Sequence, residues 1–319
     1  MKKEKIVFFG TPNFASNILQ GLIDNGYNVI AVVSQPDKPV GRKKILMPTP
    51  VKEVALANNI EVFQPISLRK DYSFLSNLDF DLIISAAYGQ MIPNEVLAMP
   101  HINSINVHGS LLPSYRGGAP IQRSIINGDT KTGITIIKMV DKMDAGLMYA
   151  KKEIKIDKNI NSTDLFALLS NVGKDLLLSV LDDILDNKIE GLVQDEDKVT
   201  FAFNIKREEE KIDFNDKALN VHNKIRGLSL TPGAYCLFND KELKIYESRL
   251  SDLSNDNKEP GTLRIENKNH LYVKCLDGYV EILSLQLEGK QKMDTKSFLN
   301  GYDKNKLIGG KLQWKEVFY

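Results

Sequence analysis

The chain has 319 residues, of which 42% are hydrophobic and 26% charged, and its formal net charge is +1. This length allows two domains with cores of their own, and the composition is typical of an ordinary globular protein. Because the charges nearly balance, a nucleic-acid partner would have to meet a local basic surface. No apolar run approaches the roughly 20 residues of a membrane span, so we expect no membrane association.

The cysteines and the N-terminus indicate a cytoplasmic protein. Cys236 and Cys275 lie far apart in apolar, strand-like surroundings, which fits neither a disulfide framework nor a zinc site and predicts buried free thiols. The apolar run at residues 6–9 is too short for the core of a signal peptide. The four histidines have no spacing typical of metal ligands, so we expect no metal.

The first 33 residues predict a strand at residues 6–9, a helix at 14–25 and a strand at 29–33. This βαβ pattern predicts a parallel sheet covered by helices. The first turn, Gly10-Thr-Pro-Asn-Phe14, is not the G-x-G-x-x-G of dinucleotide-binding folds, so the fold does not imply NAD.

Residues 35–52 form a basic, proline-rich stretch. Its charged residues are Lys38, Arg42, Lys43, Lys44 and Lys52 against Asp37, so the net charge is five minus one, +4. Four prolines and a glycine predict an irregular loop rather than a helix or strand. The stretch is either a solvated surface loop or a basic arm that contacts phosphates, with residues 45–47 as an apolar wedge.

Two later strands predict where a ligand would bind. A helix is expected at residues 51–58, a short strand at 61–63, and the apolar run at 81–87 suits a central parallel strand. Ligands of open α/β sheets bind beyond the carboxyl ends of strands. Residues 88–93 and 108–113 each follow such an end, so we expect them to form two walls of one cleft. For the side chains of Tyr88 and Met91, packing in the core and contact with a ligand are equally expected.

The alternating residues 104–108 predict a strand on which Asn106 and His108 share one face, and Ala119-Pro120 then begins a helix. An Asn amide and a protonated His can both donate to a carbonyl oxygen that becomes an oxyanion, a large term in acyl transfer. Such a pair alone is more often a polar strand end with a structural histidine.

Residues 133–139 predict another strand, followed by a turn-rich loop that contains Asp141 and Asp144. A carboxylate near His108 would orient the imidazole and stabilise its charged form. Aspartates in such loops are more often turn formers. An apolar stripe at helical spacing over residues 165–185 then predicts a long helix.

The pattern changes after residue 188. We expect a first domain at residues 1–188, a linker at 189–205 and a second domain at 206–319. The second domain contains a helix at residues 217–226 and then about five short strands between turns, which favours a small OB-like β-barrel.

A long signature gives a family resemblance. Residues 106–122 read Asn-Val-His-Gly-Ser-Leu-Leu-Pro-Ser-Tyr-Arg-Gly-Gly-Ala-Pro-Ile-Gln, ungapped, and resemble the 10-formyltetrahydrofolate-dependent formyltransferases. The resemblance spans nearly the whole chain. It implies an α/β protein with a Rossmann-like folate-binding domain and an OB-like domain that binds tRNA. It also implies that Asn106, His108 and Asp144 are catalytic, with Asp144 in a short Asp-x-Gly motif.

The resemblance also implies two binding surfaces. Within the family, the backbone of one loop and a second loop hold the pteridine, which here correspond to Tyr88, Gly89, Gln90, Met91, Ile92, Ser110, Leu111, Leu112 and Pro113. The basic stretch resembles the loop by which one branch of the family engages the acceptor end of initiator tRNA. Lys38, Arg42, Lys43 and Lys44 are the expected tRNA-binding residues.

The expected reaction moves the formyl group of 10-formyltetrahydrofolate to the α-amino group of methionine on initiator tRNA, in a monomer without metal. The chain departs from the family at Leu147, where a further Asp is common, and at Ser229-Leu-Thr-Pro-Gly233, where Asn-Pro-Trp-Pro-Gly is common. Two alternatives remain. One is a formyltransferase acting on an amino sugar nucleotide, against which the basic stretch and the second domain argue. The other is a catalytically inactive tRNA-binding module, against which the complete Asn106, His108 and Asp144 set argues.

Overall fold

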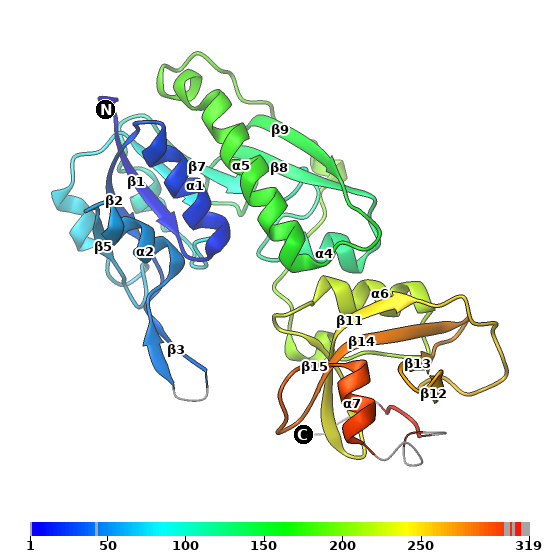
Figure 1. Ribbon diagram of the computed structural model, residues 1–319. Helices are drawn as coiled ribbons and strands as arrows, with labels where there is room; N and C mark the ends of the chain where they lie inside the picture. Colours follow the sequence, from blue (N-terminus) through cyan, green and yellow to red (C-terminus); the bar gives the residue numbers. More distant parts are fainter. Residues whose placement is uncertain (1, 42–43, 303–306, 308–309, 314–319) are drawn as a thin grey trace. The chain divides into compact units, whose positions relative to one another are not determined.

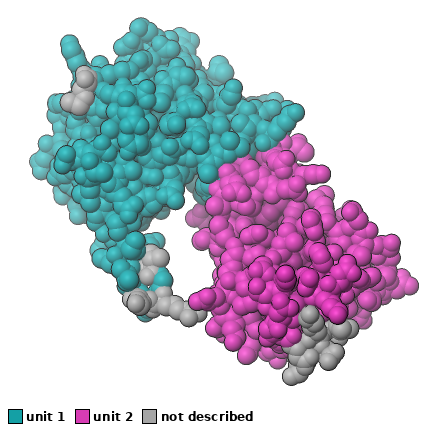
Figure 2. Space-filling model, in the orientation of Figure 1, with its two compact units in different colours: residues 1–120, 131–155, 166–203 teal, residues 121–130, 156–165, 204–319 magenta. Residues whose placement is uncertain are grey.

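The computed structural model describes residues 2–41, 44–302, 307 and 310–313 (Figure 1). The chain divides into two compact units (Figure 2). Unit 1 comprises residues 1–120, 131–155 and 166–203, and unit 2 comprises residues 121–130, 156–165 and 204–319. The division near residue 203 falls in the segment 189–205, and the domain limits at 188 and 206 stay a prediction.

Unit 1 is built on a sheet of order β5-β2-β1-β6-β7-β8-β9 within the described residues. The parallel strands are β1 (Lys5–Gly10), β2 (Asn28–Val33), β5 (Glu61–Phe63), β6 (Leu82–Ala86) and β7 (Asn103–His108). β8 (Lys131–Lys138) and β9 (Met148–Lys155) continue the sheet in antiparallel orientation. The predicted Rossmann-like parallel sheet is confirmed, whereas the sequence patterns gave no indication of β9.

Helices cover the sheet because its central strands are apolar on both faces. Residues 6–9 of β1 are all 0% exposed. The helices of unit 1 and its boundaries are α1 (Asn13–Asp24), α2 (Pro50–Ala57), α3 (Asn94–Leu97), α4 (Pro120–Ile126) and α5 (Ser162–Leu185), with a 3-10 turn η1 (Ser73–Asn77). α1 lies beside α5, where the Asn17 amide donates to Ser170 Oγ at 3.0 Å. Val7 and Phe9 pack with Leu75 of η1 and Val96 of α3.

The prediction of an irregular loop at residues 35–52 is wrong. β3 (Lys38–Val40) pairs antiparallel with β4 (Ile45–Met47), and this hairpin extends from the rest of unit 1 (Figure 1). Proline is tolerated here because a two-stranded ribbon consists only of edges, where no N–H of Pro39 is required for a further strand. Gly41 (φ 71°) and Lys44 (φ 47°) supply the left-handed turn conformations. Arg42 and Lys43 lie outside the described residues.

The base of this hairpin is fixed by a polar network. Lys52 Nζ lies 2.6 Å from Asp37 Oδ2 and 2.8 Å from Gln64 Oε1, and Gln64 Nε2 donates to Asp37 Oδ1 at 2.7 Å. These hydrogen bonds, from Gln64 first and then Lys52, lower the pKa of Asp37. Lys52, counted among the basic residues of the stretch, therefore has a structural partner.

Unit 2 contains a small antiparallel sheet of order β10-β11-β14-β13-β12, with β15 beside β14. Its strands and helices are β10 (Ala234–Phe238), β11 (Lys241–Leu250), β12 (Leu263–Glu266), β13 (His270–Lys274), β14 (Tyr279–Leu287), β15 (Met293–Asp294), α6 (Ala218–Gly227) and α7 (Thr295–Gly301). Residues 310–313 hydrogen-bond to both edges, through Gln313 to Leu237 and Gly310 to Leu263, each at 2.9 Å. The β-rich second domain is confirmed, and full closure as an OB-like barrel stays a prediction.

Both cysteines are buried and free, as predicted. Burial raises the pKa of Cys236 and raises that of Cys275 to about 12, so both thiols are protonated and unreactive at neutral pH. No helix in the described ranges is both long enough and apolar enough to cross a membrane.

His222 of α6 should make unit 2 sensitive to mild acid. The side chain is 4% exposed, and its Nδ1 lies 2.9 Å from Ser248 Oγ. Burial, followed by the charge of Arg226, lowers the pKa of His222 to about 4, against the opposing effect of a hydrogen bond to the Lys158 backbone. The unfolded chain takes up a proton near pH 6.5, whereas the folded chain does not, so stability is lost as the pH falls from 6.5 to 4.

His222→Asn removes this titration. Between pH 7 and pH 4.5, both proteins should lose free energy of unfolding. We expect the variant to lose about 3 kcal/mol less than the wild type. Urea unfolding followed by circular dichroism at both pH values measures the difference. Equal losses in the two proteins would contradict the assignment, and between pH 7 and pH 8 the two should change alike.

Candidate active site

The predicted catalytic strand ends at the carboxyl edge of the parallel sheet. β7 pairs in parallel with β6, which places Asn106 beside Ser85 and leaves His108 as the last residue of the strand. Strand alternation puts Asn106 and His108 on one face. The edge at the carboxyl ends of parallel strands is where open α/β sheets bind their ligands.

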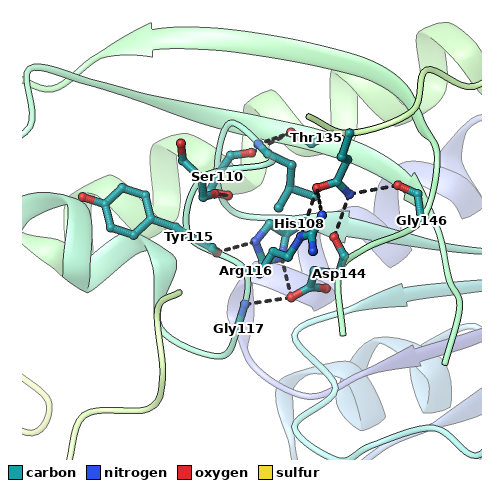
Figure 3. A network of polar contacts seen from close by, with 11 residues as sticks. His108, Ser110, Tyr115, Arg116, Gly117, Thr135, Asp144 and Gly146 are labelled. Carbon is teal, nitrogen blue, oxygen red and sulfur yellow. Dashed lines mark hydrogen bonds and ion pairs between the residues drawn. The ribbon is translucent and has the colours of Figure 1, made fainter. Parts of the chain in front are cut away.

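Both nitrogens of the His108 imidazole face hydrogen-bond acceptors (Figure 3). Nε2 lies 2.9 Å from the carbonyl oxygen of Tyr115, and Nδ1 lies 3.6 Å from Asp144 Oδ2. The ring is only 5% exposed, so water has little access to it. Nε2 donates in its contact, because a carbonyl oxygen can only accept.

Asp144 is held where the His108 ring can use it. Its Oδ2 accepts from the Gly117 N–H at 2.8 Å, and its backbone is in the left-handed region at φ 51°. Holding a non-glycine residue in this region costs on the order of 1 kcal/mol of folding free energy. Residues held in this way cluster at functional sites. Gly146 completes the motif because a Cβ there would lie 1.9 Å from the Lys138 carbonyl oxygen.

Residues 200–202 lie along the loop that follows β7. The Arg116 N–H donates to the Thr200 carbonyl at 2.9 Å, and the Ala202 N–H donates to the Arg116 carbonyl at 2.8 Å. A Cβ on Gly117 would lie 2.7 Å from the Ala202 carbonyl oxygen, so this close approach requires glycine. The loop that carries the Gly117 N–H is therefore supported by a segment more than 80 residues away in sequence.

Asn106 and Asp141 differ in their position relative to the His108 ring. Asn106 is half-buried, and its side chain makes no hydrogen bond with any residue that the structure describes, so its amide can donate to a ligand. Asp141 is exposed and has no hydrogen-bond or ion-pair partner among the described residues. Of the two loop aspartates, the structure brings Asp144 and not Asp141 to His108. Leu147 packs against Gly191.

The first predicted folate-binding loop, residues 110–113, is fixed by β8 and β9. Thr135 Oγ1 donates to the Ser110 carbonyl at 2.7 Å and accepts from the Leu112 N–H at 3.1 Å. Lys151 Nζ donates to the Leu112 carbonyl at 2.7 Å, and the Leu112–Pro113 peptide is cis. Ser110 and Leu112 are buried, while Leu111 and Pro113 are half-buried.

The second predicted folate-binding loop, residues 88–92, has both packing and exposed members. The Tyr88 ring lies in the core, edge-on to Phe9 with centroids 5.3 Å apart, and burial raises the pKa of Tyr88. Its carbonyl accepts from Thr11 Oγ1 at 2.8 Å. Gln90 Oε1 accepts from a backbone N–H, Ile92 is buried, and Gly89 and Met91 are exposed. Packing is therefore the observed role of the Tyr88 side chain.

Two more residues belong to the site, although the patterns above did not assign them a role. Arg116 is 0% exposed, with NH2 2.7 Å from Glu196 Oε1, and Gln194 is 4% exposed beside it. Arg116 and then Lys142 lower the pKa of Glu196 to about 2. Arg116 lies inside the signature and could have been found there, whereas no pattern around Gln194 points to the site.

A separate cavity of about 410 Å³ lies at the β5 edge of the sheet. Its lining residues are Phe63, Gln64, Pro65, Asp71, Ser73, Phe74 and Asn77. None of the predicted catalytic or folate-binding residues lines it, so it is not part of this site.

The fold is that of a formyl transferase. The sequence profile of the formyl transferase family matches residues 4–181, and that of its C-terminal domain matches residues 204–303. Methionyl-tRNA formyltransferase of Ligilactobacillus salivarius is 47% identical over 311 residues, which cover 96% of this chain and 98% of that protein. The enzyme of the same name from Mesoplasma florum is 44% identical, covering 93% and 95%. The chain belongs to the methionyl-tRNA formyltransferase family.

Solved structures of similar fold are more distant. WlaRD, described as a sugar 3N-formyl transferase, has a TM-score of 0.66 at 22% identity and covers 91% of this chain and all of that one. HypX from Aquifex aeolicus in complex with tetrahydrofolic acid has a TM-score of 0.67 at 17% identity, covering 99% of this chain and 50% of that one. At these identities the likeness concerns the fold alone.

Asp144→Asn should lower kcat about 10²- to 10⁴-fold, the range in which a positioned acid or base contributes. The amide still accepts from the Gly117 N–H but no longer offers a carboxylate to His108. His108→Ala should abolish formyl transfer while leaving tRNA affinity nearly unchanged. Steady-state formyl transfer and filter binding of tRNA measure both.

Two matched variants serve as controls. Asp141→Asn changes the exposed aspartate of the same loop, and His101→Ala changes a histidine whose side chain is 63% exposed and whose partner is Asp79. Both should keep wild-type kcat. Persistent activity in His108→Ala, or equal losses in Asp141→Asn and Asp144→Asn, would contradict the roles proposed for this site.

Proposed function

We propose that the chain transfers the formyl group of 10-formyltetrahydrofolate to the α-amino group of methionine esterified to initiator tRNA. The observation that carries the proposal is the 44–47% identity, over nearly the full chain, to proteins named methionyl-tRNA formyltransferase. The contact between His108 and Asp144 at the sheet edge supports it from chemistry.

The proposed reaction is direct acyl transfer. The neutral amine attacks the formyl carbon and a new C–N bond forms, giving a tetrahedral oxyanion. The Asn106 amide and protonated His108 stabilise this oxyanion. The bond between the formyl carbon and N10 of the folate then breaks. The proton lost by the amine reaches N10, by way of Asp144 and a water, so atoms and charges balance.

In this mechanism, His108 must give up one of its present hydrogen bonds. Its Nε2 donates to the Tyr115 carbonyl in the structure, at 2.9 Å. Stabilising an oxyanion would exchange this hydrogen bond for one to the substrate. Asp144 on the other nitrogen would keep the ring charged and oriented meanwhile. Much of the rate would come from proximity, because both substrates are large enough to be clamped in place.

The folate is proposed to lie between the two loops that follow β6 and β7. The Ser110 and Leu112 side chains are buried and the Tyr88 ring lies in the core, so these residues would support the loops while backbone groups contact the pteridine. Gly89, Gln90, Met91, Ile92, Leu111 and Pro113 complete the proposed set. HypX, a structure of similar fold, was solved in complex with tetrahydrofolic acid, which supports a folate donor for this chain.

The hairpin β3–β4 is proposed to contact tRNA. Lys38 and Lys44 are exposed, and Ile45, Leu46 and Met47 are 57%, 64% and 45% exposed. Exposed cations beside an exposed apolar strand suit phosphates and a wedge against a terminal base pair. Arg42 and Lys43 between the strands would add charge to the same contact.

We further propose a cytoplasmic monomer that needs no metal, since amide and imidazolium donors can stabilise the oxyanion by themselves. Dialysis against EDTA should then leave activity unchanged. The alternative acceptor, an amino sugar nucleotide, has support only from structures of similar fold at 20–22% identity. The exposed basic hairpin argues for tRNA.

Formyl transfer to initiator tRNA is the central test. Labelled formyl from 10-formyltetrahydrofolate should appear on methionyl initiator tRNA and not on methionyl elongator tRNA. Acid-precipitable label measures both. Transfer to a sugar amine but to neither tRNA, by protein that binds folate, would overturn the proposal.

The hairpin can be tested apart from the catalytic site. Arg42→Ala and Lys44→Ala should each lower kcat/KM for methionyl-tRNA roughly 3- to 10-fold and reduce the slope of log kcat/KM against log salt by about 0.7–0.9 for each phosphate that is no longer neutralised. KM for 10-formyltetrahydrofolate should not change. Lys188→Ala removes a lysine that is 66% exposed elsewhere on unit 1 and should leave all three values as they are. Equal damage to tRNA and folate kinetics would refute the hairpin's role.

A further inference from the structure

We infer that Gln194 is a positioning residue that, oriented by the buried Arg116, holds Asp144 in place for the reaction. This inference rests on the proposed function. It concerns a side chain 50 residues beyond Asp144 in sequence. Figure 3 labels Arg116, Asp144 and Gly146 in the network of polar contacts around them.

The Gln194 amide group joins both ends of the Asp-x-Gly motif. Nε2 donates to the Asp144 carbonyl at 2.7 Å and to the Gly146 carbonyl at 2.9 Å. The side chain is 4% exposed, so water does not compete for these acceptors. Both amide hydrogens are thus used, one on each side of Ala145.

Arg116 decides which way the Gln194 amide points. Gln194 Oε1 accepts from Arg116 Nε at 3.1 Å and from NH2 at 2.9 Å. If the amide were turned over, its NH2 would face the guanidinium and its oxygen would face two carbonyls, so every contact would be repulsive. The planar fork of a guanidinium fixes such an orientation better than a lysine could.

The same segment is attached to the loop at other points. Arg116 NH2 also lies 2.7 Å from Glu196, which compensates its buried charge, and Glu196 accepts from Lys142 Nζ at 2.8 Å. Leu192 and Met148 exchange two backbone hydrogen bonds, each at 2.8 Å. The segment 192–196 therefore runs along the Asp144 loop from Lys142 to the start of β9.

Asp144 requires this support because no helix or strand contains it. Residues 139–147 lie between β8 and β9, and Asp144 adopts φ 51°, which an Asp does not prefer. Gly117 fixes the carboxylate, and Gln194 fixes the backbone from which the carboxylate projects. A displacement of about 1 Å at a reacting group can cost about 100-fold in rate.

Gln194→Glu tests the role with little change in shape. The variant keeps an oxygen for Arg116 but places the other oxygen against the two carbonyls. We expect kcat for formyl transfer to methionyl-tRNA to fall about 10- to 100-fold, with KM for both substrates within about twofold of the wild type. Gln194→Met removes both donors without adding charge, and it should lower kcat as well.

Asp195→Asn is the matched control. It changes the next residue on the same segment, whose side chain pairs with Lys198 and caps the 3-10 turn η2 (Glu196–Lys198), a cap that Asn can also provide. It should keep wild-type kcat. Thermal unfolding of each variant separates a loss of folded protein from a loss of rate per folded molecule.

A double-mutant cycle shows whether Gln194 acts through Asp144. In an Asp144→Asn background, Gln194→Glu should cost less than threefold, because the group it positions is already gone. The inference would be overturned if the double variant lost kcat by the product of the two single-variant factors. It would also be overturned if kcat were unchanged in Gln194→Glu and Gln194→Met. Absence of transfer by the wild-type protein would instead refute the proposed function, so the two failures are distinguishable.

Discussion

The site depends on one carboxylate being held against one imidazole. Asp144 Oδ2 lies 3.6 Å from His108 Nδ1, and the same oxygen accepts from the Gly117 N–H. His108 is fixed by the last position of a sheet strand, whereas Asp144 lies in a loop that has no regular structure of its own. The rest of unit 1 around the site can be understood as a set of contacts that compensates for this difference in rigidity.

These contacts come from segments far apart in the chain. Residues 200–202 support the loop that carries Gly117, and Gln194 contacts the backbone of the Asp144 loop. β8 and β9 fix residues 110–113 through Thr135 and Lys151. The segment 189–205, whose composition is that of a linker, thus provides part of the surroundings of the candidate active site. Polar, irregular sequence is compatible with a rigid role where its backbone and amides are used as donors and acceptors.

The hairpin β3–β4 follows a different principle. Its base is fixed by Lys52, Asp37 and Gln64, while Lys38 and the apolar side chains of β4 remain in solvent. Exposed apolar strands are costly and favour association, so their presence beside lysines is itself an indication of a partner. A hydrogen-bonded base with an exposed end allows a basic surface to reach a large ligand without altering the sheet that carries the proposed catalytic residues.

The sequence by itself determined the βαβ start of the chain, the parallel sheet, the β-rich second domain and the family, but neither β9 nor the hairpin β3–β4. It did so because apolar periodicity and a 17-residue signature are local properties of the chain. It also placed Asn106 and His108 on one strand face. The resemblance selected Asp144 through its Asp-x-Gly motif, and the tertiary structure decided that Asp141 does not share the contact with His108, because the fold of the loop leaves Asp141 exposed.

The fold likewise decided the contacts of Arg116 and Gln194, the pairing of Lys52 with Asp37 and the hairpin itself. Each depends on contacts between residues distant in sequence, or on edges where the usual exclusion of proline from strands does not apply. Local patterns record what a segment can form, and long-range packing selects which polar groups meet.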